Sequence, residues 1–301
     1  MKEFGRLITA MVTPFDAQGK VDYQQAKNLA RSLLNSGSDG LVVCGTTGET
    51  PTLSVDEKLQ MFAEVKSAIG NRGTVIAGTG NYNTRESQEL TREAEKLGVD
   101  ACLLTVPYYN RPTQEGLIEH FTAIARVTSL PCILYNVPSR TATNLAADSV
   151  IKLSQVDNIV GVKEASGNFR QIAKIIEGTG DGFLVYSGND GDTLLVLALG
   201  GYGLVSVAAH LSGPQIREMI DKFLQAKNQE AAAIHRHLLP LVDSLFIVAN
   251  PIPLKYALNY LGFPVGKPRL PLVEPDEKSA SIIRETLERY KGELAVPSTK
   301  A

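Results

Sequence analysis

The sequence predicts an α/β fold, a (β/α)8 TIM barrel with a C-terminal helical extension. Short and nearly continuous apolar runs recur along the first two-thirds of the chain, which is the pattern of parallel strands covered on both faces. Amphipathic helical patterns separate these runs. The chain has 301 residues, and a barrel of this kind forms a single domain of roughly 250 residues. A doubly wound sheet is disfavoured, because no GxGxxG follows any of the runs.

Eight apolar runs are the expected strands. They cover residues 7–12, 41–44, 74–77, 101–106, 132–135, 159–162, 183–186 and 203–207. None of them alternates apolar with polar residues, as the strands of a sandwich with one solvated face would. Helical patterns alternate with the strands, and eight strands match the number that closes this type of barrel.

Helical patterns fill the intervals between the expected strands. They cover residues 23–37, 55–69, 87–97, 114–128, 146–153 and 168–177. Several end at a glycine, the residue that most easily takes a left-handed conformation after the last helical turn. These glycines are Gly37, Gly70 and Gly98.

The apolar runs stop after Gly213, and only helical patterns follow. They lie near residues 214–227, 229–248, 253–261 and 276–290. We therefore expect a catalytic barrel over residues 1–213 and a helical extension over residues 214–301. Because no linker or low-complexity stretch separates the two, the extension should pack on the barrel.

The composition excludes several classes of function. The net charge of −2 gives no electrostatic footprint for nucleic acid or for a membrane surface. No run reaches the roughly 18 apolar residues of a membrane helix. Cys44, Cys102 and Cys132 each lie in an apolar run without a CxxC pair, so we expect reduced core thiols and a cytoplasmic protein.

The barrel prediction indicates where an active site lies, because barrels carry it at the C-terminal ends of their strands. The residues just after the apolar runs are rich in hydroxyls and phenols and include one amine. They are Thr13, residues 45–49, 78–81 and 107–110, Tyr135, Asn136, Lys163, Glu164, residues 187–190, and Val205 with Ser206 on the last run.

Lys163 is the candidate nucleophile. It ends the run NIVGVK, so its side chain should point into the mouth of the barrel. An apolar surrounding favours the neutral form of an amine, and a neutral amine can attack a ketone to form an imine. Two other roles remain open for Lys163, a structural ion pair with Glu164 and a ligand for phosphate.

Tyr135 ends the preceding strand, so its phenol could share the barrel mouth with Lys163 and move the protons that imine formation requires. It could equally be a core tyrosine. Thr46 and Thr47 lie in a tight glycine-bounded loop and offer hydroxyl and N–H groups to a carboxylate or a proton relay. The alternative for both is a simple turn with helix-capping threonines.

The sequence favours neither a metal nor a cofactor. The four histidines are scattered, and only two of them lie close together, at positions i and i+2, where they would face apart on a helix. They are His120, His210, His235 and His237. The motifs GTTGET and GTGN are rich in glycine but lack the lysine and the spacing of a phosphate-binding P-loop.

Five motifs in this order carry a resemblance to a known family. They are GTTGET (45–50), PYYNRP (107–112), YNVPSRT (135–141), GVKEASGN (161–168) and SGND (187–190). From about Leu7 to Pro271 the chain resembles the dihydrodipicolinate synthase/N-acetylneuraminate lyase family. Within it, YNVPSR and PYYN resemble the branch that condenses pyruvate with L-aspartate 4-semialdehyde on the diaminopimelate route to lysine. Sialic acid lyases usually lack an arginine at the place of Arg140.

The resemblance implies the catalytic roles. Lys163 would form the imine with pyruvate, and Tyr135 would be the general acid and base. Thr46 and Tyr109 would complete a proton relay with Tyr135, and Tyr109 would reach into the site of a neighbouring subunit. No cofactor would be needed, because the imine itself acts as the electron sink.

The resemblance also implies the binding roles and the assembly. Thr47 would bind the carboxylate of pyruvate, and the backbone at Gly188 and Val205 would line the site. Arg140 would hold the carboxylate of aspartate semialdehyde. The protein would be a homotetramer built as a dimer of dimers.

Two other functions remain open. A related lyase or dehydratase could act on a sialic acid or another sugar-derived 2-oxo acid, although such a substrate needs more hydrogen-bonding groups than one guanidinium. A non-catalytic barrel could instead bind a metabolite as a sensor.

Some members of the resembling family are inhibited by lysine at a cleft between subunits. Of the matching positions here, two keep the pattern, Glu86 and Tyr108, and five depart from it, Thr50, Pro51, Val55, Lys58 and Tyr82. Val55 cannot form hydrogen bonds, and Lys58 would repel the ammonium group of the inhibitor. We expect inhibition by lysine to be weak or absent.

Overall fold

The computed structural model describes residues 4–297 and confirms the predicted fold class. Eight strands lie in chain order in a closed barrel, and each overlaps one of the eight predicted runs. Every strand pair whose register is resolved is parallel. The strands are β1 (Leu7–Ala10), β2 (Gly40–Val43), β3 (Thr74–Gly78), β4 (Ala101–Thr105), β5 (Cys132–Asn136), β6 (Ile159–Glu164), β7 (Leu184–Ser187) and β8 (Gly203–Ser206).

The chain divides into two compact units. The central unit runs from Thr74 to Val205, and the terminal unit comprises the described residues up to Gly73 together with those from Ser206 onward. The predicted division at Gly213 is a different partition of the chain, and it stays a prediction.

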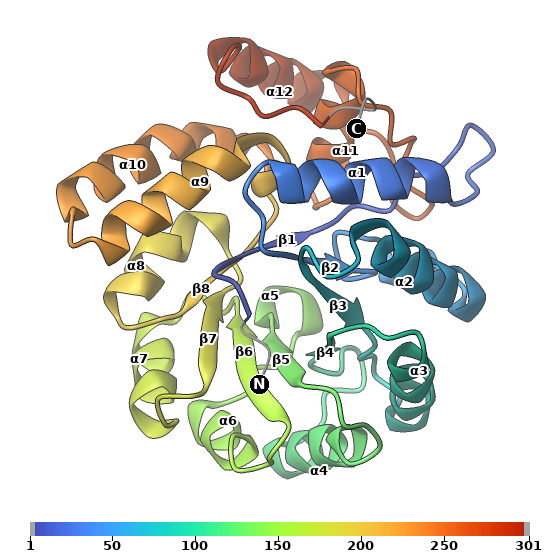
Figure 1. Ribbon diagram of the computed structural model, residues 1–301, viewed down its shortest axis with the longest axis vertical. Helices are drawn as coiled ribbons and strands as arrows, with labels where there is room; N and C mark the ends of the chain where they lie inside the picture. The colour runs from blue at the N-terminus through green and yellow to red at the C-terminus, as the bar shows by residue number, and fades with distance from the viewer. Residues whose placement is uncertain (1–3, 298–301) are drawn as a thin grey trace. The chain divides into compact units, whose positions relative to one another are not determined.

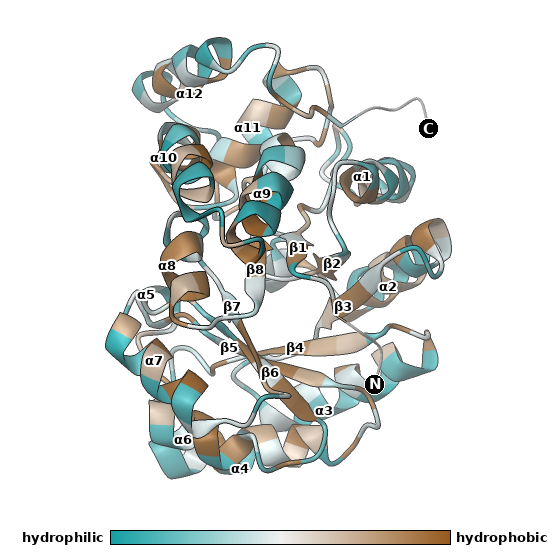
Figure 2. Ribbon diagram, turned by 60° about the vertical axis from the view of Figure 1, so that its left-hand side comes forward, coloured by the Kyte–Doolittle hydropathy of each residue, from teal (hydrophilic) through white to brown (hydrophobic). Residues whose placement is uncertain are grey.

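The central unit is built from strands whose outer faces are covered by helices (Figure 1). The helices are α3 (Thr84–Lys96), α4 (Gln114–Ala125), α5 (Pro138–Thr141), α6 (Ala147–Leu153), α7 (Phe169–Gly178) and α8 (Thr193–Ala198). Leu104, Leu134 and Val162 of neighbouring strands pack in one buried cluster with helix residues such as Phe121 and Ile172. Figure 2 shows strands β4 and β6 largely brown, whereas the helices around them carry both brown and teal. The helices therefore bury one face and solvate the other.

The terminal unit contains the chain's first two strands and the C-terminal helices. Its helices are α1 (Tyr23–Asn35), α2 (Val55–Ile69), α9 (Ala209–Leu224), α10 (Asn228–Ser244), α11 (Ile252–Tyr260) and α12 (Glu277–Arg289). Helix α1 packs against α2, while α9 packs against β1 and α1. Helices α9 and α10 lie side by side, and α12 contacts both α10 and α11 (Figure 1). Of the predicted extension, α9 thus packs directly on β1 and α1.

Helix α9 contains the predicted helix start near Pro214 and a short helical segment ahead of it. The backbone of Ser212 is not helical, so α9 consists of two helices joined at a kink, and the second begins just before Pro214, as predicted. A proline suits the first turn of a helix. The short first segment begins at Ala209, whose N–H donates to the hydroxyl of Ser206 at 2.8 Å, and it was not predicted. Helices α5 and α8 were not predicted, since 4 and 6 residues are too few to show a helical period.

Three smaller expectations can be compared with the structure. Gly37, the first of the predicted helix-ending glycines, has a φ of 102°. Cys44, Cys102 and Cys132 are free and buried, and burial raises the pKa of the first two to about 12, so the expected core thiols are confirmed. No helix within residues 4–297 is both long and apolar enough to cross a membrane.

Candidate active site

Strand register in the central unit places Lys163 beside Tyr135. Their Cα atoms are direct partners across the β5–β6 pair, and each side chain is only 5% exposed. The residues just before them, Leu134 and Val162, lie in the outer core under the helices. Because successive side chains alternate between the faces of a strand, Lys163 and Tyr135 point to the inside of the barrel. The sequence prediction that they share one place is confirmed by this register.

The amine of Lys163 lies against the face of the tyrosine ring. Its Nζ is 4.3 Å from the centroid of the Tyr135 ring, a distance at which a cation is attracted to the ring. On the other side of Lys163, Tyr186 of β7 is its register partner and is fully buried. Both strands next to β6 therefore carry a tyrosine that is the register partner of Lys163.

Lys163 makes no ion pair with any residue that the structure describes, and Glu164 is bound elsewhere. The Glu164 carboxylate accepts hydrogen bonds from Asn136 Nδ2 (3.1 Å to each oxygen), from Ser166 N (2.8 Å) and from Gln171 Nε2 (3.1 Å). Being adjacent on the strand, Glu164 and Lys163 point to opposite faces. The alternative role of Lys163 as a structural partner of Glu164 is therefore wrong.

The hydrogen bonds of Glu164 form a network on the outer face of the strands that carry Lys163 and Tyr135. Asn136 follows Tyr135 in β5, and its Oδ1 accepts the N–H of Leu145 at 2.9 Å. Gln171 connects the network to α7. Because the network ties the ends of β5 and β6 to each other and to α7, it holds the backbone that carries Lys163 and Tyr135. Sequence reasoning missed it; the only signal was a polar residue directly after each candidate.

Arg140 carries an unengaged guanidinium. It lies exposed in the single-turn helix α5, which begins at Pro138. Among the described residues its guanidinium has no carboxylate or carbonyl partner. An arginine in this state can offer its planar fork of donors to a ligand carboxylate.

Tyr109 projects away from the rest of the central unit. Its side chain is 93% exposed, and its φ of 74° lies in the left-handed region, which is uncommon for a residue other than glycine. Its neighbours fix the loop, since Asn110 Nδ2 donates to Tyr82 O at 3.1 Å and the rings of Tyr82 and Tyr108 meet edge to face at 5.0 Å. The structure does not bring Tyr109 to Tyr135 within the described part of the chain.

Gly188 and Val205 occupy the ends of the last two strands. The N–H of Gly188 donates to Glu164 O at 2.7 Å, and a Cβ at position 188 would lie 2.6 Å from the Cβ of Ala165. This close approach requires glycine. Val205 is buried and lies two residues after Gly203, the register partner of Tyr186, so it shares the inner face of β8.

Thr46 and Thr47 belong to the terminal unit, in a loop that directly follows β2. Thr47 is 3% exposed, and its Oγ accepts a hydrogen bond from Asn250 Nδ2 at 2.9 Å. The loop is tight, because a Cβ at Gly48 would lie 3.0 Å from the Cα of Cys44. Neither threonine caps a helix, since Ser54 caps α2, so the helix-capping alternative is wrong.

A buried ion pair fixes the end of this threonine loop. Lys255 of α11 donates to Glu49 at 2.8 Å, and the two side chains are 1% and 0% exposed. The N–H of Arg269 donates to the other carboxylate oxygen at 2.8 Å, and Lys255 Nζ lies 4.0 Å from the centroid of the Phe15 ring. Burial outweighs the attraction of Glu49 and lowers the pKa of Lys255 to about 8. No feature of the sequence predicted this contact.

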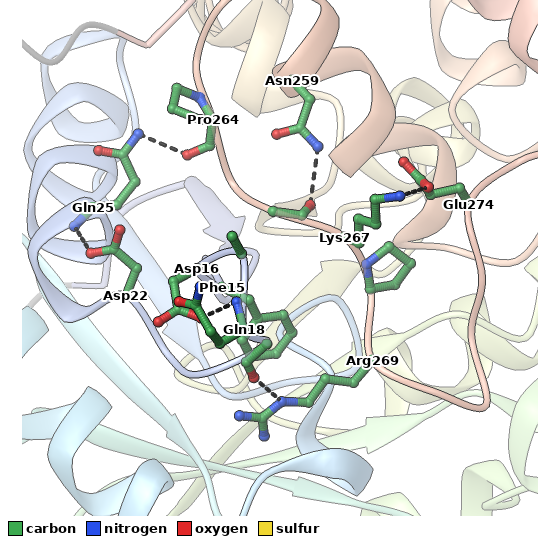
Figure 3. A pocket seen from close by; sticks show the side chains of 14 residues that line it. Phe15, Asp16, Gln18, Asp22, Gln25, Asn259, Pro264, Lys267, Arg269 and Glu274 are labelled. Atoms are coloured by element: carbon green, nitrogen blue, oxygen red, sulfur yellow. Dashed lines mark hydrogen bonds and ion pairs between the residues drawn. The ribbon is translucent and has the colours of Figure 1, made fainter.

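A cavity of about 780 Å³ in the terminal unit is lined by residues 15–25 and 259–274 (Figure 3). Several of its polar side chains bind one another or the backbone. Gln25 donates to Pro264 O at 2.8 Å, and Lys267 pairs with Glu274. The lining contains none of the predicted site residues. Among residues 4–297 no three His, Cys, Asp or Glu side chains are grouped for a metal ion.

Comparison with known proteins gives consistent results over nearly the whole chain. Residues 3–290 match the model of the dihydrodipicolinate synthetase family. A protein of Dehalococcoides mccartyi (strain ATCC BAA-2266 / KCTC 15142 / 195), called 4-hydroxy-tetrahydrodipicolinate synthase, is 63% identical over 98% of this chain and 100% of its own length. A protein of the same name from Moorella thermoacetica is 54% identical over 94% of this chain and 99% of its own length.

Solved structures agree with the sequence comparisons. A dihydrodipicolinate synthase from Bacillus anthracis superposes with a TM-score of 0.94 at 44% identity and covers 96% of this chain and 99% of that chain. One from Cyanidioschyzon merolae, with lysine bound, gives a TM-score of 0.93 at 47% identity and covers 95% and 97%. The motifs that carried the resemblance therefore lie within a match that spans nearly the entire chain, and the chain belongs to the dihydrodipicolinate synthetase family.

Proposed function

We propose that this protein is a lyase-class enzyme, a 4-hydroxy-tetrahydrodipicolinate synthase, that condenses pyruvate with L-aspartate 4-semialdehyde through an imine at Lys163. The observation that carries the proposal is the buried amine of Lys163, which has no ion-pair partner among the described residues and lies 4.3 Å from the Tyr135 ring centroid. The names of the relatives at 50–63% identity support the choice of substrates.

The proposed reaction uses the chain's own groups. The neutral amine of Lys163 attacks the keto carbon of pyruvate, and loss of water leaves an imine. The phenol of Tyr135 exchanges the protons of these steps with Thr46 and Tyr109. A methyl proton is then lost to give an enamine, whose carbon attacks the aldehyde carbon of the semialdehyde. In the ring closure the amino group of the second substrate displaces the lysine.

The two substrate carboxylates have different proposed partners. Thr47 binds the carboxylate of pyruvate through its hydroxyl and N–H groups, and the backbone at Gly188 and Val205 lines the same site. Arg140 binds the carboxylate of the semialdehyde, and its exposed and unengaged guanidinium supports this role.

Tyr109 makes assembly part of the proposal. Its side chain is 93% exposed in a loop that the neighbouring tyrosines hold in place. We propose that it completes the relay in a second copy of the chain, within a homotetramer built from dimers. The proposed location is the cytoplasm, since the three cysteines are free thiols.

Chemical trapping tests the imine. Pyruvate followed by borohydride should add a stable adduct to the peptide that contains Lys163, as peptide mass mapping would detect. The Lys163→Ala variant should lose this adduct, while Lys174→Ala, which removes an exposed lysine paired with Asp148, should keep it. An undiminished adduct in Lys163→Ala would overturn the assignment.

A pair of turnover assays tests the substrates. Pyruvate with aspartate semialdehyde should be consumed, and N-acetylneuraminate should not be cleaved. Turnover of N-acetylneuraminate alone would favour the sialic acid lyase, and trapping without any turnover would favour the sensor.

A further inference from the structure

We propose that Asn250 is a positioning residue for pyruvate binding, because it holds the Thr47 hydroxyl with its proton free for the substrate carboxylate. This inference rests on the proposed function of Thr47. It assigns a role to a residue 203 positions away in the chain, beyond the barrel strands.

The contact between the two side chains is direct and buried. Asn250 Nδ2 donates to Thr47 Oγ at 2.9 Å, and the two residues are 6% and 3% exposed. A threonine hydroxyl has one proton to donate and two lone pairs that accept. The amide of Asn250 occupies one lone pair, and within residues 4–297 no acceptor takes the proton of Thr47. The hydroxyl is therefore held as a donor, which is what a carboxylate ligand requires.

Stability of the folded state does not explain why an amide side chain stands at position 250. Its Oδ1 is buried and has no hydrogen-bond partner in the described part of the chain. Its only side-chain hydrogen bond there is the one to Thr47. A buried carbonyl without a partner destabilises the folded state, and an apolar side chain of similar size would avoid that loss. A polar residue at such a position indicates a functional role.

The surrounding contacts hold this arrangement in place. Asn250 stands two residues before α11, and Lys255 in that helix donates to Glu49 at 2.8 Å. The hydroxyl of Thr13 also donates to the carbonyl oxygen of Gly48 at 2.7 Å. The threonine loop is thus bonded at three consecutive positions, 47, 48 and 49. A shift of the Asn250 amide relative to Thr47 would have to break several of these contacts.

Steady-state kinetics with the Asn250→Leu variant test the proposal. The KM for pyruvate should rise roughly tenfold, as expected for loss of one hydrogen bond to a charged group. The KM for the semialdehyde should stay within about twofold, and borohydride should still label Lys163 at saturating pyruvate. The midpoint of thermal unfolding should be unchanged or higher. An unchanged KM for pyruvate would overturn the proposal, and so would an equal rise in both KM values.

Two more variants separate positioning from packing. Asn250→Asp can only accept, so it should draw the Thr47 proton away and raise the KM for pyruvate roughly a hundredfold. The control Asn259→Ala removes an amide that bonds Gly266 O and Val265 N in the same region, so it should lower stability and leave the KM for pyruvate unchanged. If the KM for pyruvate rose as much in Asn259→Ala as in Asn250→Leu, the effect would arise from a general loss of packing in this region and not from the position of the Thr47 hydroxyl.

A double-mutant cycle shows whether Asn250 acts through Thr47. In the Thr47→Val background, Asn250→Leu should change the KM for pyruvate by less than about twofold, because residues that act as one unit are not additive. Full additivity would contradict the proposal. If the unaltered protein did not trap pyruvate at Lys163, the proposed function itself would fail. Normal trapping with an unaffected Asn250→Leu would refute only the role of Asn250.

Discussion

Lys163 in the central unit and Thr47 in the terminal unit are positioned by different means. In the central unit, Lys163 and Tyr135 are register partners on adjacent strands, so backbone hydrogen bonds set their places. In the terminal unit, the loop of Thr47 is held by the side chains of Asn250 and Lys255, which lie more than 200 residues away. Many backbone hydrogen bonds therefore hold Lys163 in place, whereas a few side-chain contacts hold the loop of Thr47.

This difference predicts two kinds of response to substitution. A change at Lys163 or Tyr135 should alter the proposed chemistry and leave the fold intact, because backbone hydrogen bonds set the strand register. A change in the loop of Thr47 should alter stability and the proposed binding of pyruvate together. Asn250 should be the exception, because its buried Oδ1 has no hydrogen-bond partner among the described residues.

The largest effect is expected from Tyr135→Phe. The ring and its packing against Lys163 remain, but the proposed proton donor is lost, so kcat/KM should fall by roughly two to four orders of magnitude. Chemical denaturation should give an unchanged midpoint. Tyr260→Phe, which alters an exposed phenol of α11, is the control and should keep full activity. A fall of kcat/KM of less than tenfold in Tyr135→Phe would show that the phenol does not take part in the reaction.

Breaking the buried ion pair should produce the largest effect on stability. Lys255→Met leaves Glu49 as an uncompensated buried charge, which should lower the free energy of unfolding by about 3–5 kcal/mol. The double variant Lys255→Met with Glu49→Gln should recover much of this loss. Urea unfolding of the unaltered protein, of Lys255→Met, of Glu49→Gln and of the double variant measures both effects. If the double variant were as unstable as Lys255→Met, the loss would arise from packing and not from charge.

Acid should destabilise both units through buried histidines. Burial lowers the pKa of His120 in α4 and of His210 in α9 from 6.5 to about 4. Between these values the unfolded chain binds the proton and the folded chain does not, so the free energy of unfolding should fall as the pH drops from 6.5 to 4. A shift of this size contributes about 3 kcal/mol per histidine. Urea unfolding at several pH values measures the slope.

The two histidines should differ at neutral pH. His210 uses both ring nitrogens, since Nε2 accepts from Val12 N at 3.3 Å and Nδ1 bonds Val207 O at 2.9 Å. The Nε2 of His120 is buried with no partner among the described residues. His120→Gln should therefore lose little stability at pH 7.5 and flatten the acid slope, while His210→Gln should lose more. If the free energy of unfolding had the same dependence on pH in the unaltered protein and in His120→Gln, His120 would not contribute to the loss of stability in acid.

The smallest effect is expected from added lysine. Val55 and Lys58 lie on the same helix of the terminal unit, and Val55 is 57% exposed with no hydrogen-bonding group to offer. Titration of lysine at saturating pyruvate should leave activity unchanged up to about 1 mM, which corresponds to roughly −4 kcal/mol of binding. Half-inhibition below that concentration would show that the terminal unit also has a regulatory role.

The difference between strand register and long-range side-chain contacts also explains which residues the sequence could predict. Apolar runs located all eight strands, and the rule that barrels carry chemistry at strand ends selected Lys163 and Tyr135. Both depend on local pattern and on backbone geometry. Asn250 escaped prediction because a hydrogen bond across 203 residues leaves no period or spacing in the sequence. The short segment of α9 ahead of the kink at Ser212 also escaped prediction, because it is too short to show a helical period.

Arg140 has a consequence for how new enzymes could arise from this chain. Its side chain is exposed on a single-turn helix and is not bonded to any described residue, so its replacement disturbs no packing. We expect that a library randomised at position 140 alone would fold as well as the parent chain and would keep the proposed imine chemistry of Lys163. Under the proposed role of Arg140, acceptance of a different aldehyde would then evolve by single substitutions on α5, without the loss of stability that accompanies most changes in an active site.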